Sequence, residues 1–255
     1  MKKKLLRWGR NKFINSNIIS LNDEINLDKL EYKNLITRGT GRSYGDSSLY
    51  ENVLLTEKLN KILDFDDKKG IITCESGIKL YQILEVIIPK GWFLPVSPGT
   101  SNISFGGAIA SDIHGKNHHK SGTFCEYIDS IKILIGNARV LNLSREENHD
   151  LFFATCGGMG LTGIIISAKL KLKKLNSSLI KLKSIKTKNI KQTIEIIKNN
   201  NNVEYSVAWL DLLNKSTLGK GIVLLGEHHH GGPLHLKKKK QISIPLFLFL
   251  FINNF

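Results

Sequence analysis

The sequence predicts an α+β fold in which short strands and short helices alternate with glycine-rich loops. Three observations indicate this class. Residues 35–37, 53–55 and 70–75 are short runs rich in apolar and β-branched residues that are bounded by turn-forming residues. Residues 78–88 carry apolar side chains at helical spacing and stop at Pro89 and Gly91. Residues 163–175 alternate apolar residues with lysine, as a half-buried strand does.

The other elements expected before Leu175 are short. We expect a turn at 64–69 and a helix of small residues that begins near Ser104. The segments 130–136 and 139–143 predict a hairpin closed by Gly136-Asn137. A short helix is expected over 150–155.

A domain boundary is expected near Leu175, which divides the chain into domains 1–175 and 176–255. The second part contains a helix and three strands of an antiparallel α+β layer. The predicted strands are 179–186, 203–213 and 222–226, and the helix is 190–198. Because an apolar strand face needs a covering partner, so few strands predict an incomplete second domain.

Composition narrows the class of protein. The chain has 255 residues, 41% hydrophobic content and a formal charge of +15. The lysines are spread along the chain with few aromatic residues among them, so a nucleic-acid partner is not expected, whereas an anionic membrane surface or a phosphorylated substrate suits the charge. Cys74, Cys125 and Cys156 have neither metal nor disulfide spacing, so we expect reduced thiols and a cytoplasmic protein. The apolar segment 242–252 is too short to span a bilayer.

The first glycine loop, residues 38–46, follows a predicted strand. Its glycines at 39, 41 and 45 do not have the Rossmann spacing, so a nicotinamide fold is not supported. Successive backbone N–H groups could nevertheless close around a pyrophosphate, with Arg38 or Arg42 neutralising the charge and Ser43 donating a hydrogen bond. A tight turn between strands is the alternative.

Two further segments repeat this pattern of bare backbone beside polar side chains. Pro98-Gly99-Thr100 leads to Gly106-Gly107-Ala108, where a flat ring or phosphate could approach the backbone, and then to the string His114-Gly-Lys-Asn-His-His119. Residues 157–163 add four glycines before a strand. Helix packing for the glycines and a core position for His114 are the alternatives.

Together these motifs resemble the PCMH-type FAD-binding domain of the vanillyl-alcohol oxidase/p-cresol methylhydroxylase superfamily, within it most of all the decaprenylphosphoryl-β-D-ribose oxidase branch. Order, spacing and residue types agree over about residues 30–172, and the string 114–119 is the most specific part. Weaker similarity continues through 205–211 to 226–228. The resemblance implies a two-lobed FAD-binding domain followed by an antiparallel-sheet substrate domain.

The resemblance also implies which residues bind FAD. The loop 37–47 would wrap the pyrophosphate, residues 99 and 104–107 would support the dinucleotide, residues 111–114 would face the isoalloxazine, and Ile164 would touch the adenine end. The cofactor-binding residues expected are Arg38, Gly39, Thr40, Gly41, Arg42, Ser43, Tyr44, Gly45, Asp46, Gly99, Thr100, Ser104, Gly106, Gly107, Ser111, Asp112, His114 and Ile164. Many relatives attach the flavin through a histidine where this chain has Arg42, so FAD is expected to be held without a covalent link.

The implied activity is FAD-dependent oxidation of a CH–OH group by hydride transfer to flavin N5. His114 is the first candidate for a catalytic or ring-orienting role and Lys116 the second. Trp209 would line the substrate pocket, with a core position as the alternative. The implied substrate is a sugar, free or linked to a polyprenyl phosphate at the inner face of the membrane. An aldonolactone or hydroxy-acid oxidase on the same fold remains the alternative.

Family members are much longer than this chain, which is expected to be truncated at its C-terminal end. A catalytically silent FAD-binding module is therefore a second hypothesis, and a partner reductase or a separate C-terminal half remains open. Metal binding by His228, His229, His230 and His235 is disfavoured because no acidic or cysteine partner is placed beside them, so no metal is expected.

Overall fold

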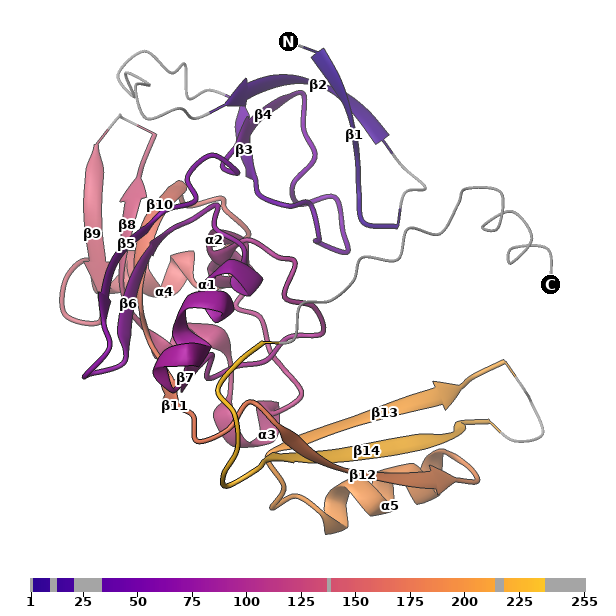
Figure 1. The fold of residues 1–255 in the computed structure, drawn as a ribbon. Helices are drawn as coiled ribbons and strands as arrows, with labels where there is room; N and C mark the ends of the chain where they lie inside the picture. The colour runs from indigo at the N-terminus through magenta and orange to yellow at the C-terminus, as the bar shows by residue number, and fades with distance from the viewer. Residues whose placement is uncertain (1, 10–12, 21–33, 137–138, 214–217, 237–255) are drawn as a thin grey trace.

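The computed structural model describes residues 2–9, 13–20, 34–136, 139–213 and 218–236 (Figure 1). The run 237–240, the apolar segment 242–252 and Asn137 of the predicted hairpin turn lie outside the described residues.

A four-stranded sheet forms the first lobe (Figure 1). In spatial order its strands are β1 (Lys2–Leu6), β2 (Phe13–Ser20), β4 (Asn52–Leu55) and β3 (Leu35–Arg38). The pair β1–β2 is antiparallel, while β2 and β3 both run parallel to β4. Leu5, Ile36 and Val53 are buried between this sheet and the loop that follows β3. The first glycine loop therefore leaves the end of edge strand β3, which is held by its parallel pairing with β4.

A five-stranded antiparallel sheet forms the second lobe. In spatial order its strands are β5 (Ile62–Asp66), β6 (Ile71–Glu75), β10 (Ile164–Lys171), β8 (Ile128–Leu134) and β9 (Val140–Ser144). The predicted hairpin is confirmed, because β8 pairs antiparallel with β9. The turn expected at 64–69 was placed too early: residues 64–66 belong to edge strand β5, and the chain turns after Asp66.

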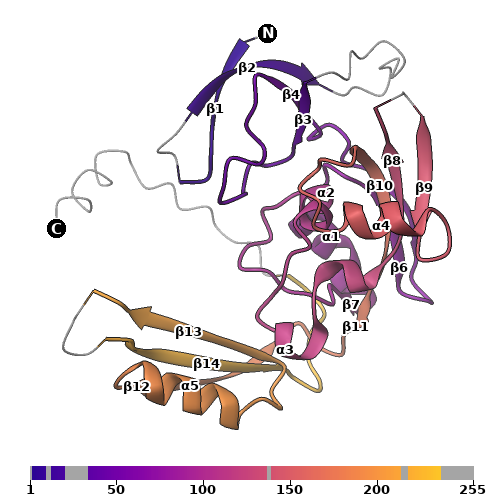
Figure 2. The ribbon, with the colours of Figure 1, turned by 180° about the vertical axis from the view of Figure 1, so that it is seen from behind.

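Three helices pack on this sheet and share its core (Figures 1 and 2). They are α1 (Leu80–Ile87), α2 (Phe105–Ala110) and α4 (His149–Thr155). Leu80, Ile83 and Ile87 form the buried face of α1, as the apolar spacing predicts. Phe105 and Phe152 are fully buried. Short elements complete this part: η2 (Ile88–Lys90), β7 (Trp92–Phe93), α3 (His118–Ser121), η3 (Phe124–Tyr127) and β11 (Lys173–Lys174).

The remaining elements form a separate layer, which we call the second layer. It consists of β12 (Ile180–Thr187), β14 (Lys220–His228) and β13 (Tyr205–Asp211), in that spatial order, with α5 (Ile190–Asn199). All pairings are antiparallel, which confirms the predicted arrangement of strands and helix. Asn189 caps α5 by accepting a hydrogen bond from the Gln192 N–H.

Helix α5 covers one face of the second layer, on the side away from the four-stranded sheet (Figures 1 and 2). Val223 and Leu225 of β14 are buried on that side. The alternate residues lie on the opposite face, which we call the open face, and there Ile222, Leu182 and Trp209 are 39%, 60% and 69% exposed.

Candidate functional site

The first glycine loop presents a row of backbone N–H groups. Among the described residues, none of the N–H groups of residues 40–45 donates a hydrogen bond to another described residue. Gly41 has a φ of 64°, which turns the loop in a way that side-chain-bearing residues resist. A Cβ added at Gly45 would meet no atom within 4 Å, so the backbone there is bare and open. Such a row of free N–H groups suits an anion with several oxygen atoms.

The second glycine segment lies directly against this loop. The Thr40 hydroxyl donates to the Asn102 carbonyl oxygen at 3.4 Å. Gly39 packs so closely on Ser104, the residue that caps α2, that a Cβ at position 39 would collide with the serine side chain. Gly99 is open like Gly45, and the described part of the chain offers no acceptor for the N–H groups of 99–101. The two loops therefore form adjacent walls of one site.

Arg38 and Asp46 make their contacts inside the lobe. The Arg38 guanidinium donates to the Leu6 carbonyl at 2.7 Å and to the Ser48 hydroxyl at 3.0 Å, and it packs beneath Gly41. Burial lowers the pKa of Arg38, although its guanidinium remains charged at neutral pH. Asp46 forms an ion pair with Arg7 at 3.0 Å. These contacts leave the exposed Arg42 as the loop cation nearest the free N–H groups.

The third glycine segment joins the end of α2 to the end of β3. The Gly157 and Met159 N–H groups donate to the Ile109 and Ala110 carbonyl oxygens at 3.1 and 2.8 Å. Gly160, with a φ of 79°, lies against the Thr37 hydroxyl, which precedes the first loop. All three glycine segments named in the sequence thus converge around α2, and main-chain atoms take part in most of the contacts.

Within α2 the two glycines differ in their surroundings. Gly106 packs on Ser76, whereas Gly107 lies beside the Ser104 side chain. Just after the helix, the Ser111 hydroxyl contacts the Met159 sulfur at 3.8 Å. Ile164 begins β10 and is 6% exposed, in a small core with Leu134.

Asp112 turns its carboxylate toward the core. Its Oδ1 accepts a hydrogen bond from the Cys125 N–H at 2.8 Å, and its φ of 36° places it in a tight turn. Because the Asp112 side chain is engaged in this way, only the Asp112 backbone would face a flavin ring at the expected position. Cys74 and Cys125 are buried and Cys156 is half-buried, and all three are free thiols.

The string 114–119 crosses the edge of this site with exposed His114 and Lys116 side chains. The Lys116 N–H donates to the Ser97 carbonyl at 3.1 Å, and Gly115 fits against the Ser97 backbone. The fully buried Asn117 donates to the Pro95 carbonyl at 2.6 Å and accepts from the Ser97 N–H at 3.3 Å. Sequence reasoning gave Asn117 no role, although a polar residue amid this specific string is the signal for one.

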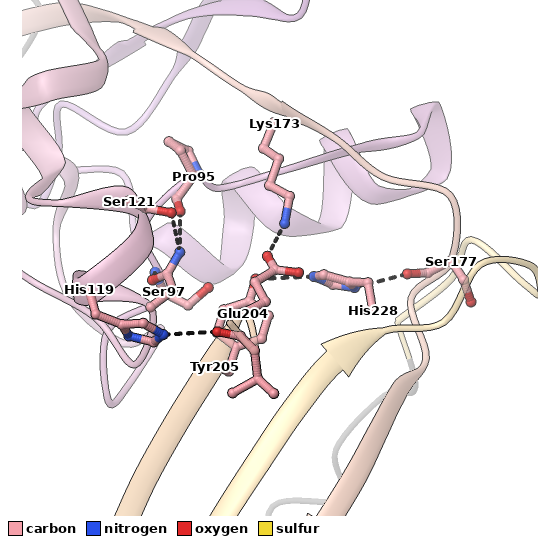
Figure 3. Close-up of polar contacts among 11 residues, drawn as sticks. Pro95, Ser97, His119, Ser121, Lys173, Ser177, Glu204, Tyr205 and His228 are labelled. Carbon is pink, nitrogen blue, oxygen red and sulfur yellow. Dashed lines mark hydrogen bonds and ion pairs between the residues drawn. The ribbon is translucent and has the colours of Figure 1, made fainter. Parts of the chain in front are cut away.

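The second layer reaches the same string through the start of β13 (Figure 3). The Ser206 N–H donates to the Lys116 carbonyl at 2.9 Å, and the His119 Nε2 lies 2.8 Å from the Val203 carbonyl. Glu204 forms an ion pair with Lys173 of β11.

A second set of contacts at this junction involves His228 (Figure 3). The Tyr205 hydroxyl lies 3.1 Å from the His228 Nε2, and the His228 Nδ1 lies 3.1 Å from the Ser177 carbonyl. The His228 ring also makes an edge contact with Phe93, with centroids 5.1 Å apart. The sequence raised His228 only as a disfavoured metal ligand and gave the other residues of this set no role, because the contacts join segments far apart in the chain.

Trp209 and the histidines that follow β14 can now be placed. Trp209 lies on the open face, so the alternative of a core position is wrong. His228 contacts Tyr205 and Ser177 as described above. The described residues contain no group of three or more His, Cys, Asp or Glu side chains that could hold a metal ion. Among the helices of that same part of the chain, none has the length and apolarity needed to cross a bilayer.

Comparison with known proteins indicates the class of protein. Residues 25–144 match the family described as "FAD binding domain". A decaprenylphosphoryl-beta-D-ribose oxidase of Mycolicibacterium smegmatis is 33% identical over 237 residues, which cover 88% of this chain and 52% of that protein. A D-arabinono-1,4-lactone oxidase of Candida glabrata is 28% identical over 67% of this chain and 31% of its own length. A Delta(24)-sterol reductase of Homo sapiens is 26% identical over 48% of this chain and 23% of its own length.

Residues 25–144 thus match the FAD-binding domain family, and FAD is the cofactor of this domain. The resemblance read from the motifs and the expected α+β fold are both confirmed. The residues present fit the cofactor, because free N–H groups and bare glycine backbone line both loops. The chain spans about half of the length of the M. smegmatis relative, and less of the others.

Proposed function

We propose that this chain is the FAD-holding part of an oxidoreductase that oxidises a CH–OH group of a sugar linked to a polyprenyl phosphate. The observation that carries the substrate class is the extent of the similarity to the ribose oxidase. Because that similarity covers 88% of the chain, it must continue past Leu175 into the second layer. The 67% covered by the lactone oxidase can be accommodated before that point. The similarity to the ribose oxidase thus includes part of the layer expected to meet substrate.

Each part of the site has a role in this proposal. The N–H groups of residues 40–45 bind the pyrophosphate, and Arg42 neutralises part of its charge. Arg38 acts from below by holding the turn at Gly41. Gly99 and the exposed Gly107 let the dinucleotide approach the backbone, whereas Gly106 is buried against Ser76. FAD, when bound, supplies the hydride acceptor.

His114 and Lys116 act on the substrate side. In this proposal His114 takes the hydroxyl proton of the carbinol, and the Lys116 ammonium binds a phosphate oxygen of the substrate. Both side chains are exposed, so a ligand can reach them. Trp209 and its neighbours on the open face offer apolar contact to the sugar or lipid part. A positively charged chain also favours an anionic, membrane-borne substrate.

The second candidate function is an FAD-binding part that turns over no substrate by itself. The open face and the share of the relatives' length favour it. The missing contribution would come from further polypeptide, in the same chain or another.

Anaerobic titration separates these functions. We expect the purified 255-residue chain to show visible flavin absorbance and to bleach when a polyprenyl-phosphate-linked pentose is added. Bleaching by an aldonolactone but not by the lipid-linked sugar would favour a lactone oxidase. A yellow protein that neither compound bleaches would support the binding part, and a colourless protein would contradict the proposal.

A further inference from the structure

The second layer contacts the FAD-binding domain at the start of β13. Residues at or just before its start are bonded to the domain at separate points. Glu204 pairs with Lys173 (Figure 3), Ser206 bonds to Lys116, and Val203 bonds to His119. The Lys116 peptide is therefore held from both sides, because its N–H donates to Ser97 and its carbonyl accepts from Ser206. The backbone position of Lys116 depends on where β13 lies.

Tyr205 and His228 fix that strand end. Burial raises the pKa of Tyr205 to about 12, so its hydroxyl keeps its proton and can donate to His228. Burial, with the nearby Lys173 charge, lowers the pKa of His228 below its ordinary value of 6.5. The neutral ring can donate from Nδ1 to the Ser177 carbonyl and accept at Nε2 from Tyr205.

The charges around His228 make this arrangement sensitive to its protonation. Lys173 of β11 and Tyr205 of β13 face the ring, Phe93 of β7 packs on it, and Glu204 is already paired with Lys173. A protonated ring could no longer accept from Tyr205 and would repel Lys173. The Glu204 carboxylate, which lies at this junction, is already paired with Lys173 and so does not offset the charge of a protonated ring.

We propose that Tyr205 and His228 are positioning residues that hold β13 against the string 114–119 and so set the placement of Lys116 and His114. The bonds that transmit this effect are the Ser206–Lys116 and Val203–His119 contacts. The catalytic meaning rests on the proposed function, whereas the mechanical coupling does not. In this proposal the second layer faces the string 114–119 and also determines where that string lies.

Amide hydrogen exchange of the full chain tests the coupling. Tyr205→Phe removes one hydroxyl and should lower the protection of the Lys116 and Ser206 amides by roughly two- to tenfold, the range expected for one lost hydrogen bond. Tyr81→Phe on α1 is the matched control and should leave both amides unchanged. Amides of α1 serve as an internal reference in both variants. Unchanged protection at Lys116 and Ser206 in Tyr205→Phe overturns the proposal.

A pH series supplies the second readout. Protection factors corrected for intrinsic exchange should fall at Lys116 and Ser206 as the pH drops below 6.5 toward the folded pKa of His228. His228→Gln, which keeps a donor and an acceptor, should remove this step. Because His119 also lies in the contact, His119→Gln is measured alongside and should retain the step. A step that persists in His228→Gln, or vanishes only in His119→Gln, overturns the proposal.

Either variant alone can decide the proposal, and flavin binding is measured separately from hydrogen exchange. If Tyr205→Phe fails to fold, the pH series on His228→Gln decides the outcome. Exchange at these amides needs no flavin, and flavin content is read separately from visible absorbance. Absence of flavin in the parent chain would contradict the proposed function and leave the exchange result standing.

Discussion

Single residues in the first loop determine whether the N–H groups can face a ligand. Gly41 combines a positive φ with close contact to the Arg38 guanidinium, whereas Gly45 and Gly99 border open space. The residue at position 41 is therefore constrained by conformation and by packing. Positions 45 and 99 need bare backbone only when a ligand approaches.

Gly41→Val should abolish or strongly weaken FAD binding while most of the fold remains. A side chain at this φ costs about 1–2 kcal/mol of backbone strain, and the new methyl groups would also displace Arg38. Flavin absorbance after gel filtration and the thermal midpoint measure the two effects. Gly231→Val is the matched control, because a Cβ there meets no atom within 4 Å. Equal flavin content in both variants would refute the loop assignment.

Arg42 predicts how the flavin is retained. Its guanidinium cannot make the histidyl bond that many relatives of this fold use, so acid precipitation should release all of the yellow colour into the supernatant. Flavin that stays in the protein pellet would contradict non-covalent binding.

His114→Ala should leave flavin content unchanged and slow substrate-driven bleaching. A histidine that acts as acid or base at the reacting centre contributes about 10²–10⁴-fold. His149→Ala, an exposed histidine on α4, is the control and should bleach at the parental rate. A parental rate in His114→Ala would assign this residue to packing or to no role.

Elements differ in how clearly the sequence predicted them. Helix α1 and strands β3, β4, β6, β8, β9, β12 and β14 follow from apolar periodicity and turn residues. Strand β5 was missed because its Asp64 and Asp66 are typical of turns, and an edge strand tolerates them on its free side. Strands β1 and β2 were not expected, since the lysines of 2–4 mask the pattern of β1 and the polar residues 15–17 interrupt the apolar run of β2.

The site likewise contains features that the sequence predicted and features that it did not. The three glycine segments could be found because each is local in sequence and its conformation requires glycine. The junction of Tyr205, His228 and Lys173 could not be found, because it depends on how the second layer docks on the domain. The internal engagement of Arg38 and Asp46 likewise reflects partners, Leu6 and Arg7, that lie more than thirty residues away.

The two faces of the second layer predict opposite responses to truncation. Leu225→Ala on the α5 face should destabilise the layer by about 2–5 kcal/mol, as expected for a buried leucine. Leu182→Ala on the open face should cost far less, because that side chain is 60% exposed. Urea unfolding followed by Trp209 fluorescence measures both. Similar losses in the two variants would show that the open face is covered in solution.

At the scale of the whole molecule, the FAD-binding domain and the second layer differ in how much of their apolar surface is buried. The domain contains the main hydrophobic core, whereas the layer buries its strands mainly against α5, and none of the described residues covers the open face. This difference in core size favours the boundary predicted near Leu175, which limited proteolysis can test.

Limited proteolysis should cut first between residues 175 and 240 and leave a resistant fragment near residues 1–175. The layer has less buried apolar area to resist local opening, and cleavage follows opening. Mass spectrometry of the early fragments gives the boundary. A uniformly resistant chain, or first cuts within 34–136, would contradict this division into domains.

The convergence of the three glycine segments on α2 has a consequence for sequence drift. Glycine backbone takes part in most of those contacts, so the shape of the cofactor cradle depends strongly on where side chains are absent. Exposed positions outside the site can then be replaced, for example by the Lys, Asn and Ile that are so frequent in this chain, without deforming the cradle. A lineage with a strong compositional bias could therefore rewrite most of the surface of this protein and still inherit its ability to hold a flavin.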